Sequence, residues 1–122
     1  MGAPRLGSIL LGSADPDRLR QWYRDAFAPA EDEHGFLDFG ETAILIDPRD
    51  DVTAANPQPG RYVLNFHVDD AAATAAHLDT LGVTWLVRPQ SRPDGIFGTL
   101  VDPDGNYLQI IELSAAYLAS RR

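Results

Sequence analysis

The sequence predicts an α+β fold built from two βαβββ modules, and three observations support this prediction. Two helix-start signals each follow a strand-like apolar run: Asp15-Pro16 follows Leu6–Ser13, and Asp69-Asp70 follows Arg61–Val68. A shift of 55 residues superposes the two halves, and each half then continues with about three strand-like segments. The last two segments flank Asp102–Asn106, where aspartate, proline and glycine each favour a tight turn.

The first half predicts a helix that begins with Asp15 as its N-cap and Pro16 at the first helical position. Its apolar residues recur at helical spacing and predict a buried face. Pro29 ends the helix because proline cannot continue it. The buried positions are Leu19, Trp22, Tyr23 and Phe27; the expected strands are a short edge strand within Ala30–His34 and a hairpin of Phe36–Phe39 and Thr42–Ile46.

The second half predicts an alanine-rich helix from Asp69-Asp70 to about Leu81, which Gly82 stops. In the strand before this helix, apolar and polar residues alternate, so one face carries hydrocarbon and the other carries Asn65 and His67. The remaining expected elements are a strand at Val83–Val87, a loop at Gln90–Gly95, paired strands at Ile96–Val101 and Tyr107–Leu113, and a short helix that Ser114 caps.

Length and composition favour a single domain and exclude several classes of function. A chain of 122 residues suits one domain, with modules at about 5–47 and 61–113 and a linker at 48–60 that is polar and rich in proline. The net charge of −8 argues against nucleic acid as a partner. Neither a membrane-spanning run nor a signal peptide is visible, so we expect a cytoplasmic protein. The absence of cysteine and lysine excludes thiol and lysine Schiff-base chemistry.

Three motifs give the chain a resemblance to a known superfamily. They are Ser13-Ala-Asp15 with Trp22-Tyr-Arg-Asp25 downstream, Asn65-Phe-His-Val-Asp-Asp70, and Asp102-Pro-Asp-Gly-Asn106 with the strand after it. Together they resemble the vicinal oxygen chelate superfamily, which includes glyoxalase I, bleomycin-resistance proteins and extradiol dioxygenases. The resemblance implies two modules whose mixed sheet curls into a cup, with the helices outside. It also implies a homodimer, because members often pair their modules across a two-fold axis.

Enzymes of this superfamily hold a divalent metal at four inward positions, one on the first strand and one on the last strand of each module. Motif spacing assigns these positions to Ser8, Ile44, Val63 and Gln109. Ile44 and Val63 are hydrocarbon, and a serine hydroxyl is a poor ligand for such metals. The resemblance therefore implies neither a metal site nor another cofactor in this chain.

The candidate binding residues are those that the alternation directs into the expected cup. Asn65 and His67 share one face of their strand, and Tyr107 and Gln109 share one face of the last strand. Trp85 offers an aromatic wall for a planar ligand. A few polar groups beside hydrocarbon form a typical small-molecule pocket.

Three functions remain open at this point. The first is a protein that binds a small apolar or aromatic molecule in the cup without metal, as bleomycin-resistance proteins sequester a drug. The second is a lyase, isomerase or dioxygenase-type enzyme of the same superfamily that uses a divalent metal or His67 as its acid-base group. The third is a structural or regulatory protein whose cup is filled by its own side chains. Catalytic residues remain unassigned, and turnover of a bound compound would separate the second function from the first.

Overall fold

A computed structural model describes residues 2–121, which form two compact units with their boundary between Ala54 and Ala55. Each unit contains one strand, one helix and then three strands, so the predicted βαβββ duplication is confirmed. Each unit also has its own four-stranded mixed sheet. None of the helices within residues 2–121 has the length and apolar composition needed to cross a membrane.

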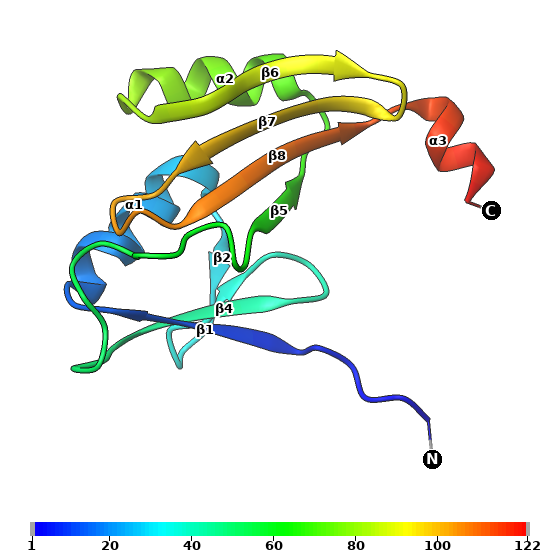
Figure 1. The fold of residues 1–122 in the computed structure, drawn as a ribbon. Coiled ribbons are helices and arrows are strands. Elements are labelled where there is room, and N and C mark those ends of the chain that lie inside the picture. Colours follow the sequence, from blue (N-terminus) through cyan, green and yellow to red (C-terminus); the bar gives the residue numbers. More distant parts are fainter. Residues whose placement is uncertain (1, 122) are drawn as a thin grey trace. The chain divides into compact units, whose positions relative to one another are not determined.

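The first unit contains a sheet in the order β1-β4-β3-β2 with one helix packed on it. β1 and β4 run parallel and lie side by side in Figure 1, whereas β3 is antiparallel to both of its neighbours. The parallel pair requires a long crossover, part of which is the helix. The elements are β1 (Ser8–Ser13), α1 (Pro16–Phe27), β2 (Ala30–Glu31), β3 (Leu37–Asp38) and β4 (Ala43–Pro48).

Helix α1 begins and ends where the sequence predicts. The Asp15 carboxylate accepts a hydrogen bond from the Arg18 N–H at 3.3 Å, and Pro16 occupies the first turn. The helix ends before Ala28, which adopts a left-handed conformation with φ of 47°. Leu19 and Tyr23 are fully buried against the unit's own strands. Trp22 and Phe27 are only half-buried, and their rings meet edge to face.

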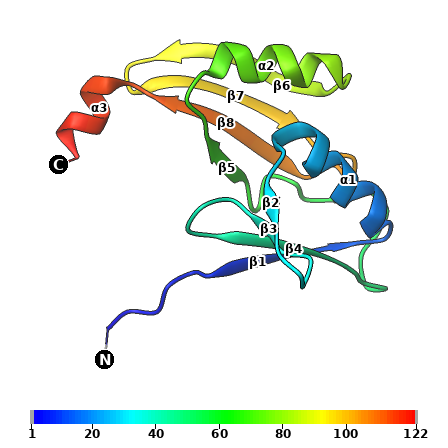
Figure 2. The same ribbon diagram turned by 180° about the vertical axis from the view of Figure 1, so that it is seen from behind.

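The second unit repeats this arrangement with longer strands, in the order β5-β8-β7-β6. β5 runs parallel to β8, and β6 and β7 add antiparallel strands, which Figures 1 and 2 show as a continuous layer with α2 along one side. A short helix, α3, follows the last strand. The elements are β5 (Leu64–His67), α2 (Ala71–Thr80), β6 (Thr84–Arg92), β7 (Gly95–Val101), β8 (Tyr107–Leu113) and α3 (Ala115–Ser120).

Packing of α2 against β6 and β8 forms the core of the second unit. The helix contributes small side chains, with Ala71 and Ala75 buried beside Leu78. The sheet contributes larger ones, because Leu100, Leu108 and Ile110 are fully buried. Alternation therefore assigns these three sheet residues to the face that α2 covers.

The expectation of a loop at Gln90–Gly95 is wrong. Strand β6 continues to Arg92, and Gln90 pairs with Phe97 on β7. The pairing register shifts twice between Trp85 and Gln90, and Pro89 lies within this irregular stretch. Proline is tolerated here because β6 is an edge strand whose pairing is already interrupted at this point, and the Pro89 ring lies against Gly98 of β7, where an added Cβ would collide with it.

Candidate functional site

The sheet of the second unit has one face covered by α2 and one face free of any helix of the same unit, which we call the open face. The pairing register defines both faces, because paired residues point to the same side of a sheet. Leu108 pairs with Leu64 and Leu100 on the helix-covered side. Gln109 pairs with Asn65 and Thr99 on the open side.

Four of the five predicted binding residues lie together on the open face. Asn65 and His67 project from β5, while Tyr107 and Gln109 project from the adjacent β8. Neighbouring strands lie about 4.8 Å apart, so these side chains are close enough to contact one small molecule. Asn65 and His67 are exposed, and Tyr107 and Gln109 are half-buried.

Gln109 is held in place by one weak hydrogen bond within the sheet. Its Nε2 donates to the Thr99 hydroxyl at 3.3 Å, across the β7–β8 pair. This bond leaves the carbonyl oxygen and the second amide hydrogen of Gln109 available to a ligand. Beside it, Ile111 is only 5 % exposed and pairs with His67 and with Phe97. The open face therefore has apolar side chains beside amide and imidazole groups.

Trp85 does not lie with the other four residues, which corrects its expected position. It pairs with Leu100, on the side that α2 covers, and its indole N–H donates to Asp79 Oδ1 of that helix at 2.8 Å. Arg88 donates to the same carboxylate at 2.7 Å and places its guanidinium carbon 5.4 Å from the indole ring centre. The Arg88 hydrogen bond, and then that of Trp85, hold the pKa of Asp79 below its ordinary value.

Motif spacing also misassigned the inward position in the first unit. Ile44 is 3 % exposed and pairs with the fully buried Leu37, so it faces the core under α1. The register places Leu45 opposite Leu10, which is 50 % exposed on the other face. The error arose because the position was counted from the turn glycine. Two residues separate Gly40 from β4 but only one separates Gly105 from β8, and a one-residue difference reverses the face of a strand residue.

The donor groups at the superfamily's metal positions do not suit a divalent metal. With the corrected register, the first unit offers Ser8 and Leu45 there, and the second offers Val63 and Gln109. Hydrocarbon cannot coordinate, and a single neutral amide carries no charge to balance a cation. Within residues 2–121, no three histidine or acidic side chains are grouped as metal ligands.

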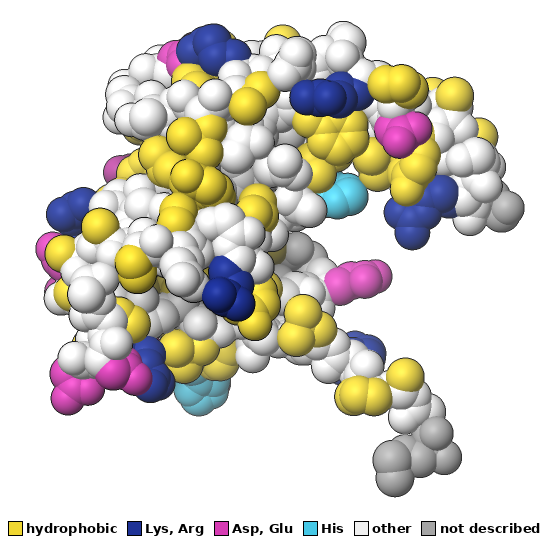
Figure 3. Space-filling model, in the orientation of Figure 1, with side chains coloured by type: hydrophobic (Ala, Val, Ile, Leu, Met, Phe, Trp, Pro, Cys, Tyr) yellow, Lys and Arg dark blue, Asp and Glu magenta, His cyan; other side chains and the backbone are white. Residues whose placement is uncertain are grey.

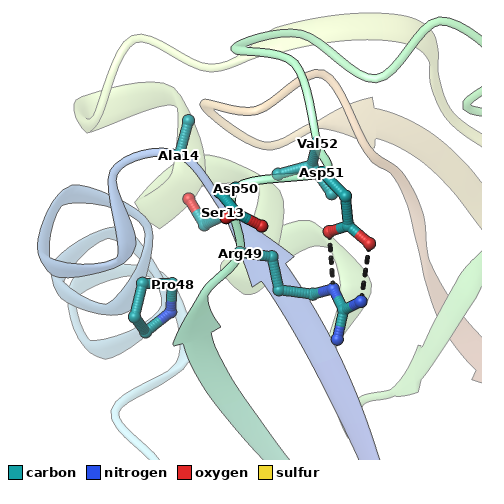
Figure 4. Close-up of a pocket in the computed structure, with 7 residues that line it drawn as sticks. All are labelled: Ser13, Ala14, Pro48, Arg49, Asp50, Asp51 and Val52. Carbon is teal, nitrogen blue, oxygen red and sulfur yellow. Dashed lines mark hydrogen bonds and ion pairs between the residues drawn. The ribbon is translucent and has the colours of Figure 1, made fainter.

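A separate surface hollow lies in the first unit, where the parallel strands β1 and β4 end (Figure 4). Arg49 dominates it, yet its guanidinium is paired with Asp51 at 2.6 Å. The aliphatic part of Arg49 also lies over Gly12, where any added Cβ would collide with it. Both charges are thus satisfied within the hollow, and most of the lining is exposed loop. The open face of the second unit is the stronger candidate site.

Sequence reasoning missed the contribution of β6 and β7 to the open face. Two residues of β7 lie on that face because they pair with open-face residues of β8: Thr99 with Gln109, and Phe97 with Ile111. Arg92 of β6 lies there because it pairs with Gly95, which pairs with Leu113. The signal that would have revealed them is the alternation of Phe97, Thr99 and Val101, read in register with β8. The space-filling view shows hydrophobic, histidine and arginine side chains exposed over this part of the molecule (Figure 3).

Several solved structures share this fold at low sequence identity. A glyoxalase/bleomycin resistance protein/dioxygenase family enzyme from Burkholderia phytofirmans is 18% identical, with a TM-score of 0.75 over 91% of this chain and 100% of that one. A glyoxalase-related enzyme from Fulvimarina pelagi is 20% identical, with a TM-score of 0.73 over 90% of this chain and 88% of that one. TnmS3, an antibiotic binding protein from a Streptomyces species, is 22% identical, with a TM-score of 0.68 over 93% and 99% of the two chains.

The sequence itself matches a family directly. No curated protein matches the chain significantly. The family model described as a glyoxalase-like domain matches residues 8–111, which span both βαβββ units from β1 to β8. The chain therefore belongs to the glyoxalase-like domain family, within the vicinal oxygen chelate superfamily.

Proposed function

We propose that this protein binds a small apolar or aromatic molecule on the open face of the second unit, without a metal ion. The observation that carries the proposal is the grouping of Asn65, His67, Tyr107 and Gln109 around the hydrocarbon of Ile111 and Phe97. Such a surface suits a ligand with an apolar body and a few polar atoms. The donor groups at the metal positions support binding without metal.

One structural relative supports a binding role. TnmS3, which shares the fold, is described as an antibiotic binding protein. A comparable role for this chain requires only affinity for a compound, and the open face supplies donors and apolar surface for that purpose. We propose a homodimer as the working form, because β1 and β5 are sheet edges with unpaired backbone groups on one side.

The test is calorimetric titration of a compound found by thermal-shift screening. His67→Ala and Gln109→Ala should each weaken binding by about 1–3 kcal/mol, because each removes a hydrogen bond that the ligand buries. His34→Ala is the matched control, since this histidine is exposed in a turn of the first unit. Unchanged affinity in both open-face variants would place the ligand elsewhere, and turnover of the compound would make the protein an enzyme.

A further inference from the structure

The open face differs in charge from the rest of the molecule. The chain has 18 acidic residues and a net charge of −8, yet its four open-face strands carry only one acid, Glu112. Glu112 lies on the helix-covered side, where its Oε1 accepts a hydrogen bond from the Ala71 N–H at 2.8 Å. The carboxylates nearest in sequence to these strands, Asp69, Asp94 and Asp102, lie in the connections beyond the strand ends, and Asp102 is buried. The strand positions of the open face therefore bear no negative side chain.

Three polar side chains on this face are also free of partners. Within residues 2–121, Asn65, His67 and Arg92 have no side-chain hydrogen bond or ion pair with another residue. Four other arginines among residues 2–121 form ion pairs, as Arg24 does with Glu31 and Arg49 does with Asp51. A guanidinium without a side-chain partner, on strands whose open side carries no carboxylate, is a ready donor for an anionic ligand, although Asp94 lies two residues away in the turn.

The two arginines of β6 differ in whether they have a partner. Arg88 lies toward α2, where it pairs with Asp79 and covers the Trp85 ring. Arg92 pairs with Gly95 in the sheet register, and Gly95 pairs with Leu113 of β8, which places Arg92 on the open face. The same strand thus directs one arginine into a structural ion pair and the other toward the candidate site.

The sheet register also defines the surface beside Arg92. Phe97 lies two residues along β7 from Gly95, on the same face, and it pairs with Ile111. Gly95, the partner of Arg92, has no side chain, and Gln90 of β6 is the direct partner of Phe97, so Arg92 lies diagonally beside the apolar pair. The four strands span about 14 Å, which is three interstrand spacings. Two or three fused aromatic rings cover the Phe97–Ile111 pair on the two central strands, and Arg92 and His67 lie one strand beyond this pair on either side.

We propose that the natural ligand of the open face is a planar aromatic anion, with its rings on Phe97 and Ile111 and its carboxylate or other acidic group at Arg92. The amides of Asn65 and Gln109 and the His67 imidazole then meet polar atoms at the opposite end of the rings. This inference rests on the proposed function, that this face binds a small molecule. A cationic ligand would find no carboxylate on these strands and would be repelled by Arg92.

The test uses two fluorescent probes with the same ring system and different charge. 8-Anilinonaphthalene-1-sulfonate is an anion, and N-phenyl-1-naphthylamine is the same molecule without the sulfonate. Titrations at 0.15 M salt limit the long-range repulsion of the net negative charge to about 8 Å. Arg92→Gln should weaken sulfonate-probe binding about fivefold and leave neutral-probe binding within about twofold. Arg88→Gln is the matched control and should change neither affinity, provided that both variants melt as cooperatively as the wild type.

The outcomes separate the two proposals. If Arg92→Gln leaves the sulfonate probe unaffected while Gln109→Ala weakens both probes, the open face binds ligands but the preference for anions is wrong. If Arg92→Gln weakens both probes equally, Arg92 acts through the structure of the site, and the inference also fails. If neither probe binds the wild type, or if neither Gln109→Ala nor His67→Ala affects either probe, the proposed function fails with it.

Discussion

Asp102 shows how one buried side chain fixes a turn. It is 4 % exposed, and its Oδ1 accepts hydrogen bonds from the backbone N–H groups of Asp104 and Asn106 at 2.9 and 3.0 Å. The Asn106 amide donates to its other oxygen and accepts a bond from the Asn56 amide. Burial of a carboxylate is tolerable here because both oxygens are satisfied. This turn also fixes the start of β8, from which Tyr107 and Gln109 project.

Gly105 gives the first prediction, because its φ of 79° lies in the left-handed region. An added Cβ would meet no atom closer than 3.6 Å, so the cost of Gly105→Ala is conformational and should be on the order of 1 kcal/mol. Urea denaturation measures it. Gly60→Ala is the control, since Gly60 has no positive φ and room for a methyl group. Equal stability of the two variants would refute the assigned role of the turn.

At the scale of elements, α2 depends on its surroundings more than on its own sequence. Its face toward the sheet is mostly alanine, so it buries little side-chain area by itself. Its first turn is capped twice: the Asp70 carboxylate accepts from the Ala73 N–H, and Glu112 of β8 accepts from the Ala71 N–H. The second bond joins the helix to the strand that carries Gln109.

Removing the second cap gives a prediction at this scale. Glu112→Ala leaves the N–H of the fully buried Ala71 without its acceptor and should cost about 1–3 kcal/mol of unfolding free energy. Glu112→Gln keeps a carbonyl oxygen at the same position and should lose much less. Urea denaturation of both variants is the measurement, and faster amide exchange at Ala71 in the alanine variant would locate the effect. Equal losses would show that charge, rather than the hydrogen bond, is what the helix requires.

Asp79 links α2 to β6 and predicts a pH dependence. Its pKa is lowered from the ordinary 3.8, first by the Arg88 hydrogen bond and then by that of Trp85. A depressed folded-state pKa contributes stability that is fully present above pH 3.8 and is lost as the pH falls through the folded value. Asp79→Asn should therefore be less stable than the wild type at neutral pH, with a difference that shrinks in acid. Denaturation curves across this pH range test it, and a constant difference would contradict the assignment.

At the scale of the whole molecule, the two units have the same topology but carry different side chains at matching positions of their sheets. Asn65 and Gln109 form a pair in the second unit, and the pair at the matching place in the first unit is Leu10 and Leu45. β2 and β3 have two residues each, whereas β6 and β7 have nine and seven. At this pair of positions only the second unit offers side-chain hydrogen-bonding groups, and its longer strands give them a wider sheet, which is why the proposed site lies there.

The last prediction concerns the assembled protein. Native mass spectrometry of the purified protein should show a dimer without bound metal, because the metal positions offer hydrocarbon and one neutral amide. The control is the same protein dialysed against nickel or zinc, which should show no stoichiometric uptake. About one tightly held metal ion per chain would contradict the metal-free proposal, and a monomer mass at micromolar concentration would contradict the dimer.

The sequence alone determined the order of elements, the starts of all three helices and the faces of β5 and β8. Those features depend on residues that are close in sequence. The side chains of Asp15, Asp70 and Ser114 accept hydrogen bonds from the first turn of their helices, and the apolar–polar alternation that assigns a face lies within one strand. Only the tertiary structure decided that Ile44 faces its helix, that Trp85 binds Asp79 and that Arg92 joins the open face. These depend on the pairing register between strands, which turn lengths and the irregular stretch of β6 set. A shift of one residue moves a side chain to the opposite face without any change in local pattern.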